Sequence, residues 1–132
     1  MKYRKGYKYQ LAETYTIKTD MTGFNIEVEF IRLYADGTLI ILSGYAWDGP
    51  SGPGIDSKNF MEGSLVHDAL YQLLRMGLLP AKYREGADKL LHKICRSKGM
   101  SKIRAWWVLR GLRFFAAQAA DPKNKKIIYT IP

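Results

Sequence analysis

The chain has few of the residues that mark extracellular or membrane-embedded proteins. Its 132 residues include one cysteine, Cys95, which excludes an intrachain disulfide. No long apolar run follows the start MKYRKGYKYQ, so we expect neither a signal peptide nor a transmembrane segment. Only two histidines are present, fewer than a His-Asp phosphohydrolase usually needs. With 132 residues, 47% of them hydrophobic, the chain is long enough for one domain with one core, and without a disulfide it does not depend on an oxidising compartment.

Acidic residues are also scarce, and they are unevenly placed. The chain has 12 Asp and Glu against 21 Lys and Arg, a net charge of +9. Residues 46–76 carry four acidic and two basic groups, whereas residues 77–120 carry two acidic and ten basic groups. This contrast fits a cation in the first segment and an anionic partner near the second, or simply basic helices that maintain solubility. No zinc-finger, RNP-like or helix-turn-helix pattern is present, so we expect no specific nucleic-acid binding.

The N-terminal third has the pattern of antiparallel strands. Residues 7–18 and 24–34 are rich in β-branched and aromatic side chains. Within the second stretch, FNIEVEF alternates so that its apolar residues share one face. The segment ADGT at 35–38 has the Asp-Gly pair of a tight hairpin, with residues 39–47 as the returning strand. We therefore expect a β-hairpin or small antiparallel sheet over residues 1–47.

Three stretches of apolar residues at helical spacing follow a glycine-rich loop at residues 48–60. They run over residues 62–76, 81–98 and 102–120. Gly77 and Gly99 end the first two, and Ser101 is a suitable N-cap for the third. Residues 126–131 can add a short final strand. The expected fold is therefore α+β, a single domain over residues 1–132 with its three helices within 61–120.

The third helical segment, SKIRAWWVLRGLRFFAAQAA, is both aromatic and basic. Its Lys and Arg residues exclude a transmembrane span, because each would cost about 2.5–3.5 kcal/mol near the bilayer centre. The helix can lie on an anionic membrane surface, since Trp and Phe beside Arg suit the headgroup region. Alternatively, Trp106, Leu109, Leu112 and Phe115 form an apolar side that packs on the rest of the protein. The residues that would contact an anionic surface are Lys102, Arg104, Arg110 and Arg113.

Residues 47–71, WDGPSGPGIDSKNFMEGSLVHDALY, contain the candidate site. One helical turn separates His67 from Tyr71, and we expect Asp88 to reach both from an antiparallel second helix. Asp88 adjoins apolar positions, so we expect it to be partly buried and to need a partner. A histidine that a carboxylate holds through one nitrogen keeps the other nitrogen for taking a proton from water.

The motif H-D-x-x-Y, an Asp on the next helix and a glycine-rich loop before the His resemble the site of phospholipase A2, including the disulfide-free form in parvovirus capsid proteins. The resemblance implies that His67 is the base, that Asp88 orients it with support from Tyr71, and that Asp68 binds calcium. Calcium prefers several oxygen ligands, including backbone carbonyls. The further ligands implied in the loop are Asp48, Gly49, Gly52 and Gly54.

A wider resemblance covers roughly residues 25–120. The segments WDGPSGP, SLVHDALY and YREGADKLLHKI, followed by a Trp- and Phe-rich helix, are similar to a family of uncharacterised proteins of tailed bacteriophages and prophages. This resemblance implies a phage origin and a place in the host cytoplasm or the virion, without an established activity. The residues that match its D-x-x-S-x-P, H-D-x-L-Y and R-x-x-A-D motifs are Asp48, Ser51, Pro53, His67, Asp68, Leu70, Tyr71, Arg84, Ala87 and Asp88.

Two classes of function remain open. The first is a calcium-dependent hydrolase of anionic lipid or another ester at a membrane surface. The second is a non-enzymatic phage accessory or virion protein, with a phage or host protein as partner, in which the His and Asp residues form a structural polar network.

Two narrower sites use the same histidine. His67, Asp88 and His92 could bind a transition metal. Ser51 could join His67 and Asp88 as a nucleophile, but it lacks the strand-to-helix elbow that exposes such a serine. Ser51 is better explained as a residue that braces its own loop.

Overall fold

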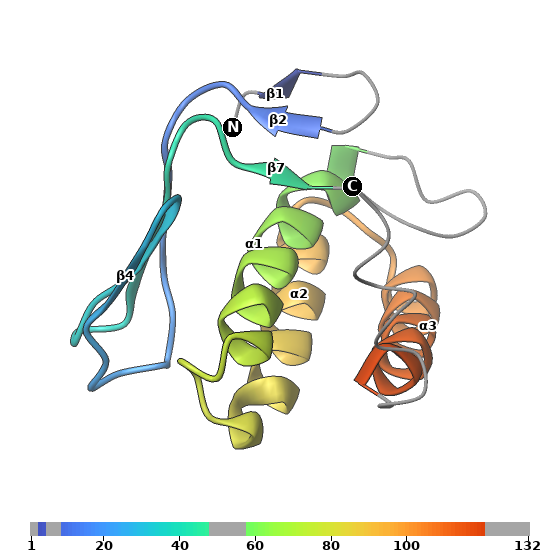
Figure 1. Ribbon diagram of the computed structural model, residues 1–132. Coiled ribbons are helices and arrows are strands. Elements are labelled where there is room, and N and C mark those ends of the chain that lie inside the picture. The colour runs from blue at the N-terminus through green and yellow to red at the C-terminus, as the bar shows by residue number, and fades with distance from the viewer. Residues whose placement is uncertain (1–2, 5–8, 48–57, 121–132) are drawn as a thin grey trace.

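The fold is α+β, with short antiparallel strands followed by three α-helices (Figure 1). The computed structural model describes residues 3–4, 9–47 and 58–120, and side chains over 9–47 and 60–111. The strands in this part of the chain are β1 (Tyr3–Arg4), β2 (Tyr9–Leu11), β3 (Tyr15–Lys18), β4 (Ile26–Val28), β5 (Ile31–Leu33), β6 (Thr38–Ile41) and β7 (Ala46–Trp47). The helices are α1 (Lys58–Arg75), the 3₁₀ turn η1 (Ala81–Tyr83), α2 (Arg84–Ser97) and α3 (Lys102–Ala120).

The strands form two antiparallel sheets, in the orders β1-β2-β7 and β3-β6-β5-β4. Figure 1 shows the first sheet near the N-terminal end of α1 and the second alongside α1, on the side away from α3. Leu39 is central to the second sheet, because it pairs with Ile17 on one side and Leu33 on the other. Leu33 and Leu39 are fully buried and belong to one core cluster with Leu65 and Leu70 of α1. This apolar contact fixes the larger sheet on α1.

The predicted hairpin at 35–38 is confirmed and joins β5 to β6. Gly37 has a φ of +91°, a conformation that a side chain would strain. The Asp36 carboxylate accepts a hydrogen bond from the Thr38 N–H at 2.9 Å, the turn contact typical of aspartate. The chemistry of the Asp-Gly pair therefore sets the turn, as its sequence indicated.

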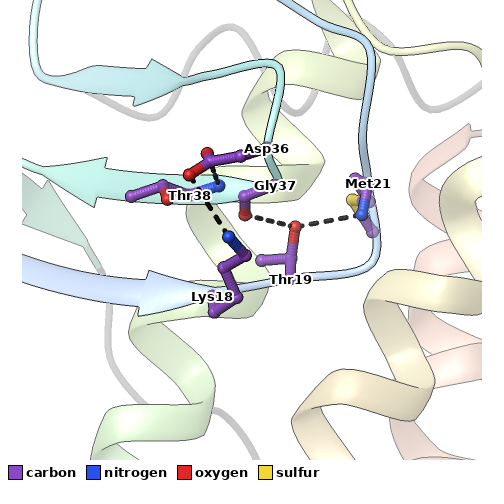
Figure 2. Close-up of polar contacts among 6 residues, drawn as sticks. All are labelled: Lys18, Thr19, Met21, Asp36, Gly37 and Thr38. Carbon is purple, nitrogen blue, oxygen red and sulfur yellow. Dashed lines mark hydrogen bonds and ion pairs between the residues drawn. The ribbon is translucent and has the colours of Figure 1, made fainter.

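A buried threonine ties this hairpin to the chain after β3. The Thr19 hydroxyl donates to the Gly37 carbonyl at 2.8 Å and accepts from the Met21 N–H at 3.1 Å. Figure 2 shows these bonds beside the ion pair of Lys18 Nζ with Asp36 Oδ2, which spans 3.2 Å. All these partners lie within one corner of the sheet, so this polar cluster is explained by folding alone.

Two predicted strands are each divided in the structure. Residues 24–34 form β4, a turn at Glu29 and Phe30, and β5, rather than one alternating strand. The apolar residues alternate up to Phe30, and then Ile31 and Leu33 continue the alternation one position out of step. Adjacent residues of one strand point to opposite faces, so a single strand cannot place both Phe30 and Ile31 on the same face. Residues 39–47 divide between β6 and β7, which belong to different sheets, and Gly44 has a φ of +99° at the bend.

The helices end close to the predicted residues, but two of them begin elsewhere. Residues 81–83, predicted as the start of the second helix, form the 3₁₀ turn η1, and α2 begins at Arg84. The first, α1, begins at Lys58, inside the segment predicted as loop, while Gly77 and Gly99 follow the helix ends with positive φ as expected. Close packing of α1 on α2 depends on Gly63, where a Cβ would lie 2.6 Å from Leu91 Cδ1 and 3.0 Å from Cys95 Sγ. Ser101 caps α3 as predicted, since its hydroxyl accepts from the Arg104 N–H at 3.2 Å.

The packing face of α3 differs from the expected one. Ala105 and Val108 are buried in a second core cluster, whereas Trp106 is 48% exposed. The members of this second core cluster are Phe60, Leu91, Cys95, Met100, Ala105 and Val108. Leu109 is half-buried, and the side chains of Leu112 and Phe115, like the strand expected at 126–131, lie outside the described residues.

Candidate functional site

The antiparallel pair α1 and α2 brings together the three residues predicted as catalytic. His67 and Tyr71 lie one turn apart on α1, and their ring centroids are 4.1 Å apart. Asp88 comes from the first half of α2, which runs back along α1 after the turn at Gly77. The amphipathic spacing of both helices places these positions at their shared face.

Asp88 holds both α1 side chains through one oxygen. His67 Nε2 lies 2.7 Å from Asp88 Oδ1, and the Tyr71 hydroxyl donates to the same oxygen at 2.8 Å. His67 is 5% exposed and Asp88 is 3% exposed. The expected contact of His67, Asp88 and Tyr71 is therefore confirmed, with His67 and Asp88 buried and Tyr71 half-buried.

The acceptor role of Asp88 sets the tautomer of His67. A carboxylate oxygen accepts this hydrogen bond, so His67 Nε2 carries its proton and Nδ1 is the other nitrogen of the ring. Burial raises the pKa of Tyr71 to about 12, with the hydrogen bond and charge of Asp88 acting in the same direction. Tyr71 is therefore a hydrogen-bond donor throughout the neutral range.

Arg84 is a further neighbour of this cluster. The sequence had indicated it only as a member of the R-x-x-A-D motif. Its hydrogen bond and charge act on Tyr71 and lower the pKa, against the larger effect of burial. The signal was available in the spacing, because Arg84 precedes Asp88 by one turn of α2 and shares its side of the helix.

The residues predicted to bind calcium divide between described and undescribed parts of the chain. Asp68 is on α1 beside His67, is partly exposed, and interacts with another group of the protein. The other predicted ligands, with the loop-bracing serine, lie outside the described residues: Asp48, Gly49, Ser51, Gly52 and Gly54.

The segment that contains those ligands starts beside α1. Trp47, the last described residue before it, is 3% exposed, and its indole N–H donates to the Ser64 hydroxyl at 3.1 Å. Ser64 in turn donates to the Met61 carbonyl at 2.9 Å. Ser64 precedes His67 by almost one helical turn, so Trp47 is held against α1 near the candidate base.

Over the described residues, no group of three or more His, Cys, Asp and Glu side chains is arranged to hold a metal ion. The alternative site of His67, Asp88 and His92 is therefore wrong. His92 lies one turn beyond Asp88 on α2, but it does not join His67 and Asp88 as a ligand set.

The basic residues predicted to contact an anionic surface lie along α3. Lys102 and Arg110 are exposed, Arg104 is half-buried, and the side chain of Arg113 lies outside the described residues. The Arg110 guanidinium carbon is 4.8 Å from the centroid of the Trp106 ring, within the range of a cation–π contact. In the described part of the chain no helix combines the length and apolar character needed to cross a membrane.

Compared with known proteins, the chain matches no family model, no curated protein and no solved structure.

Proposed function

We propose that the protein is a hydrolase in which His67 is the general base, Asp88 orients it and Tyr71 supports Asp88. The observation that supports this proposal is the pair of bonds to Asp88 Oδ1, at 2.7 Å from His67 Nε2 and 2.8 Å from the Tyr71 hydroxyl. A carboxylate that fixes one imidazole nitrogen leaves the other to exchange protons. Anionic phospholipid is the ester class to test first.

The reaction transfers one proton through His67. Nδ1 accepts a proton from water while the water oxygen bonds to the carbonyl carbon of the ester. The imidazolium, stabilised by Asp88, then returns that proton to the leaving alkoxide as the carbon–oxygen bond breaks. Asp88 keeps its charge throughout and Tyr71 keeps its proton, so both act as positioning residues.

Calcium is the cofactor that we propose for this site. Asp68 would supply one carboxylate, and Asp48 with the carbonyls of Gly49, Gly52 and Gly54 would supply the other oxygens that calcium prefers. Bound there, calcium would draw electrons from the ester carbonyl and stabilise the negative oxygen that forms. The donor chemistry of this set, all oxygen, fits calcium better than a transition metal.

The decisive experiment compares the two histidines of the chain. Acyl release from mixed anionic phospholipid vesicles is measured for the wild type, His67→Ala and the matched control His92→Ala, each with calcium and with chelator. We expect His67→Ala to lose about a hundredfold or more of the activity, as is usual for a general base, and His92→Ala to retain it. Wild-type activity that is unchanged by chelator and by His67→Ala would contradict the proposal.

Calcium binding is tested separately by thermal unfolding. We expect calcium to raise the midpoint of the wild type and to have no such effect on Asp68→Asn, because a ligand that binds only the folded state stabilises it. A midpoint that calcium leaves unmoved in the wild type would remove calcium from the mechanism.

The same contacts also support a second candidate, a phage accessory or virion protein in which the cluster is structural and the partner is a phage or host protein. The observation that favours it is burial, since His67 and Asp88 are both almost closed to solvent. Under this alternative, His67→Ala would lower the free energy of unfolding, and the wild type would release no acyl chain. Either function is compatible with the host cytoplasm or the virion, the setting that we propose from the phage resemblance.

A further inference from the structure

The first half of α3 presents apolar side chains on the side that faces away from the core. Ile103 is 74% exposed, Trp106 is 48% exposed and Trp107 is 64% exposed. With Arg110 they occupy helix positions three, four and seven residues apart, which share one face. Ala105 and Val108, on the opposite face, are the residues that pack in the second core cluster. The helix is therefore apolar on both sides, and among the described residues only the side with Ala105 and Val108 belongs to a core cluster.

This outward face is also strongly cationic. The sequence of α3 contains no Asp or Glu, and Lys102 and Arg110 are exposed beside the apolar side chains. The two indoles contact each other edge to face with centroids 5.0 Å apart, while Arg110 lies over the Trp106 ring. Aromatic rings that carry a guanidinium on one face suit the boundary between lipid headgroups and acyl chains.

We propose that this face, formed by Ile103, Trp106, Trp107 and Arg110 and called the α3 ridge, docks on an anionic lipid surface. The basic side chains would meet the headgroups, and the ring and alkyl surfaces would enter the boundary below them. A membrane surface needs no preformed groove, which suits a single convex helix. The absence of acidic side chains from α3 favours lipid over a second copy of this basic chain, because two such faces would repel each other.

Vesicle binding tests the ridge in chelator, so the outcome is independent of the proposed hydrolase. Tryptophan emission and co-sedimentation are measured with phosphatidylcholine vesicles and with vesicles that also contain phosphatidylglycerol. Trp47 is 3% exposed, so a change in emission reports Trp106 and Trp107. We expect a blue shift and binding with the anionic vesicles only. Equal binding to neutral vesicles, or none to either, would overturn the proposal.

Matched substitutions locate the binding face. We expect Trp107→Ala to weaken vesicle binding roughly tenfold, from the apolar area withdrawn from the lipid, and Arg110→Gln to weaken it about fivefold. The controls are Leu78→Ser, an apolar side chain 41% exposed in the turn after α1, and Arg75→Gln at the end of α1. Both controls should bind as the wild type does, and controls that weaken binding as much as the ridge variants would contradict the assignment.

Sedimentation velocity without lipid tests the alternative that a second copy of the chain, and not lipid, binds the α3 ridge. We expect a monomer for both the wild type and Trp107→Ala. A wild-type dimer that Trp107→Ala dissociates, together with no vesicle binding, would assign the ridge to a second copy of the chain and overturn the lipid proposal.

Discussion

Two carboxylates link α1 to the elements around it, and they differ in what surrounds them. Asp88 accepts from His67 and Tyr71, and the side chains of His67 and Asp88 are 6% and 4% exposed. Glu62 accepts from the Tyr15 hydroxyl at 2.7 Å and pairs with Lys98 Nζ at 3.3 Å, where the Lys98 side chain is 48% exposed. The first cluster lies in the core and the second reaches the surface.

Both clusters join a carboxylate, a phenol and a basic group, yet only one is suited to proton transfer. The Lys98 side chain is half exposed where it pairs with Glu62, so water screens this ion pair. The cluster around Asp88 instead contains a histidine, the side chain that most often serves as a general base. The comparison teaches that a buried polar cluster suggests chemistry only when a member can change charge.

Removing the two carboxylates should separate the clusters most clearly. Asp88→Ala leaves the His67 N–H and the Tyr71 hydroxyl without their acceptor, so we expect the free energy of unfolding to fall by about 3 kcal/mol. Glu62→Ala removes the acceptor of the Tyr15 hydroxyl and leaves Lys98 to water, and we expect a loss of about 2 kcal/mol. Urea denaturation followed by circular dichroism measures both. Asp88→Asn and Glu62→Gln are the controls that keep an acceptor oxygen, and equal losses for the two alanine variants would contradict the comparison.

Each cluster contains one tyrosine, Tyr71 beside Asp88 and Tyr15 beside Glu62, and Tyr71 can be tested at alkaline pH. Burial raises the pKa of Tyr71 to about 12, so its stabilising contribution is complete below about pH 10 and is lost as the pH rises through 12. We expect Tyr71→Phe to lower the free energy of unfolding by about 1.5 kcal/mol at neutral pH and to flatten the alkaline decline. The difference in absorbance at alkaline pH between wild type and Tyr71→Phe should show one ionisation near pH 12, and an ionisation near pH 10 would contradict it.

Tyr15→Phe is the matched change in the other cluster. The pKa of Tyr15 is also raised, first by burial and then by its bond to Glu62. We expect a comparable loss of stability from Tyr15→Phe but no effect on acyl release, since Tyr15 does not touch Asp88 or His67. Loss of activity in Tyr15→Phe equal to that in Tyr71→Phe would show that the readout follows stability and not the site.

The smallest effect is expected at the exposed hairpin. The Thr38 N–H, with help from Lys18, holds the pKa of Asp36 at about 2, below its usual range. The stabilisation is therefore present above about pH 4 and is lost as the pH falls towards 2. We expect Asp36→Asn to lower the thermal midpoint slightly at pH 5 and to match the wild type near pH 2. A difference that persists at pH 2 would assign the effect to something other than the charge.

The sequence predicted the helices and the contact of His67 with Asp88 because both depend on local periodicity. Helical spacing placed His67 and Tyr71 on one face, and the short turn after Gly77 required α2 to run back past them. The division of residues 24–34 was also readable, in the change of apolar phase after Phe30. The alternation of apolar residues from Phe24 to Phe30 hides this break, because it favours one continuous strand.

Other features depend on partners that periodicity does not reveal. Tyr15 and Glu62 are 47 positions apart, and no local pattern pairs them. The packing face of α3 was misassigned because both of its sides are apolar, and the small residue Ala105 meets the core while the bulky Trp106 does not. The roles of Asp48, Ser51 and the loop glycines stay predictions, since these residues lie outside the described part of the chain.

The position of Cys95 gives the protein a built-in reporter of local opening. It is 1% exposed beside Phe60 and Met100, and burial raises its pKa to about 11. A thiol in this state does not react with a labelling reagent until the second core cluster separates. Because Cys95 is the sole cysteine of the chain, the labelling rate of the unaltered protein measures how often the second core cluster opens.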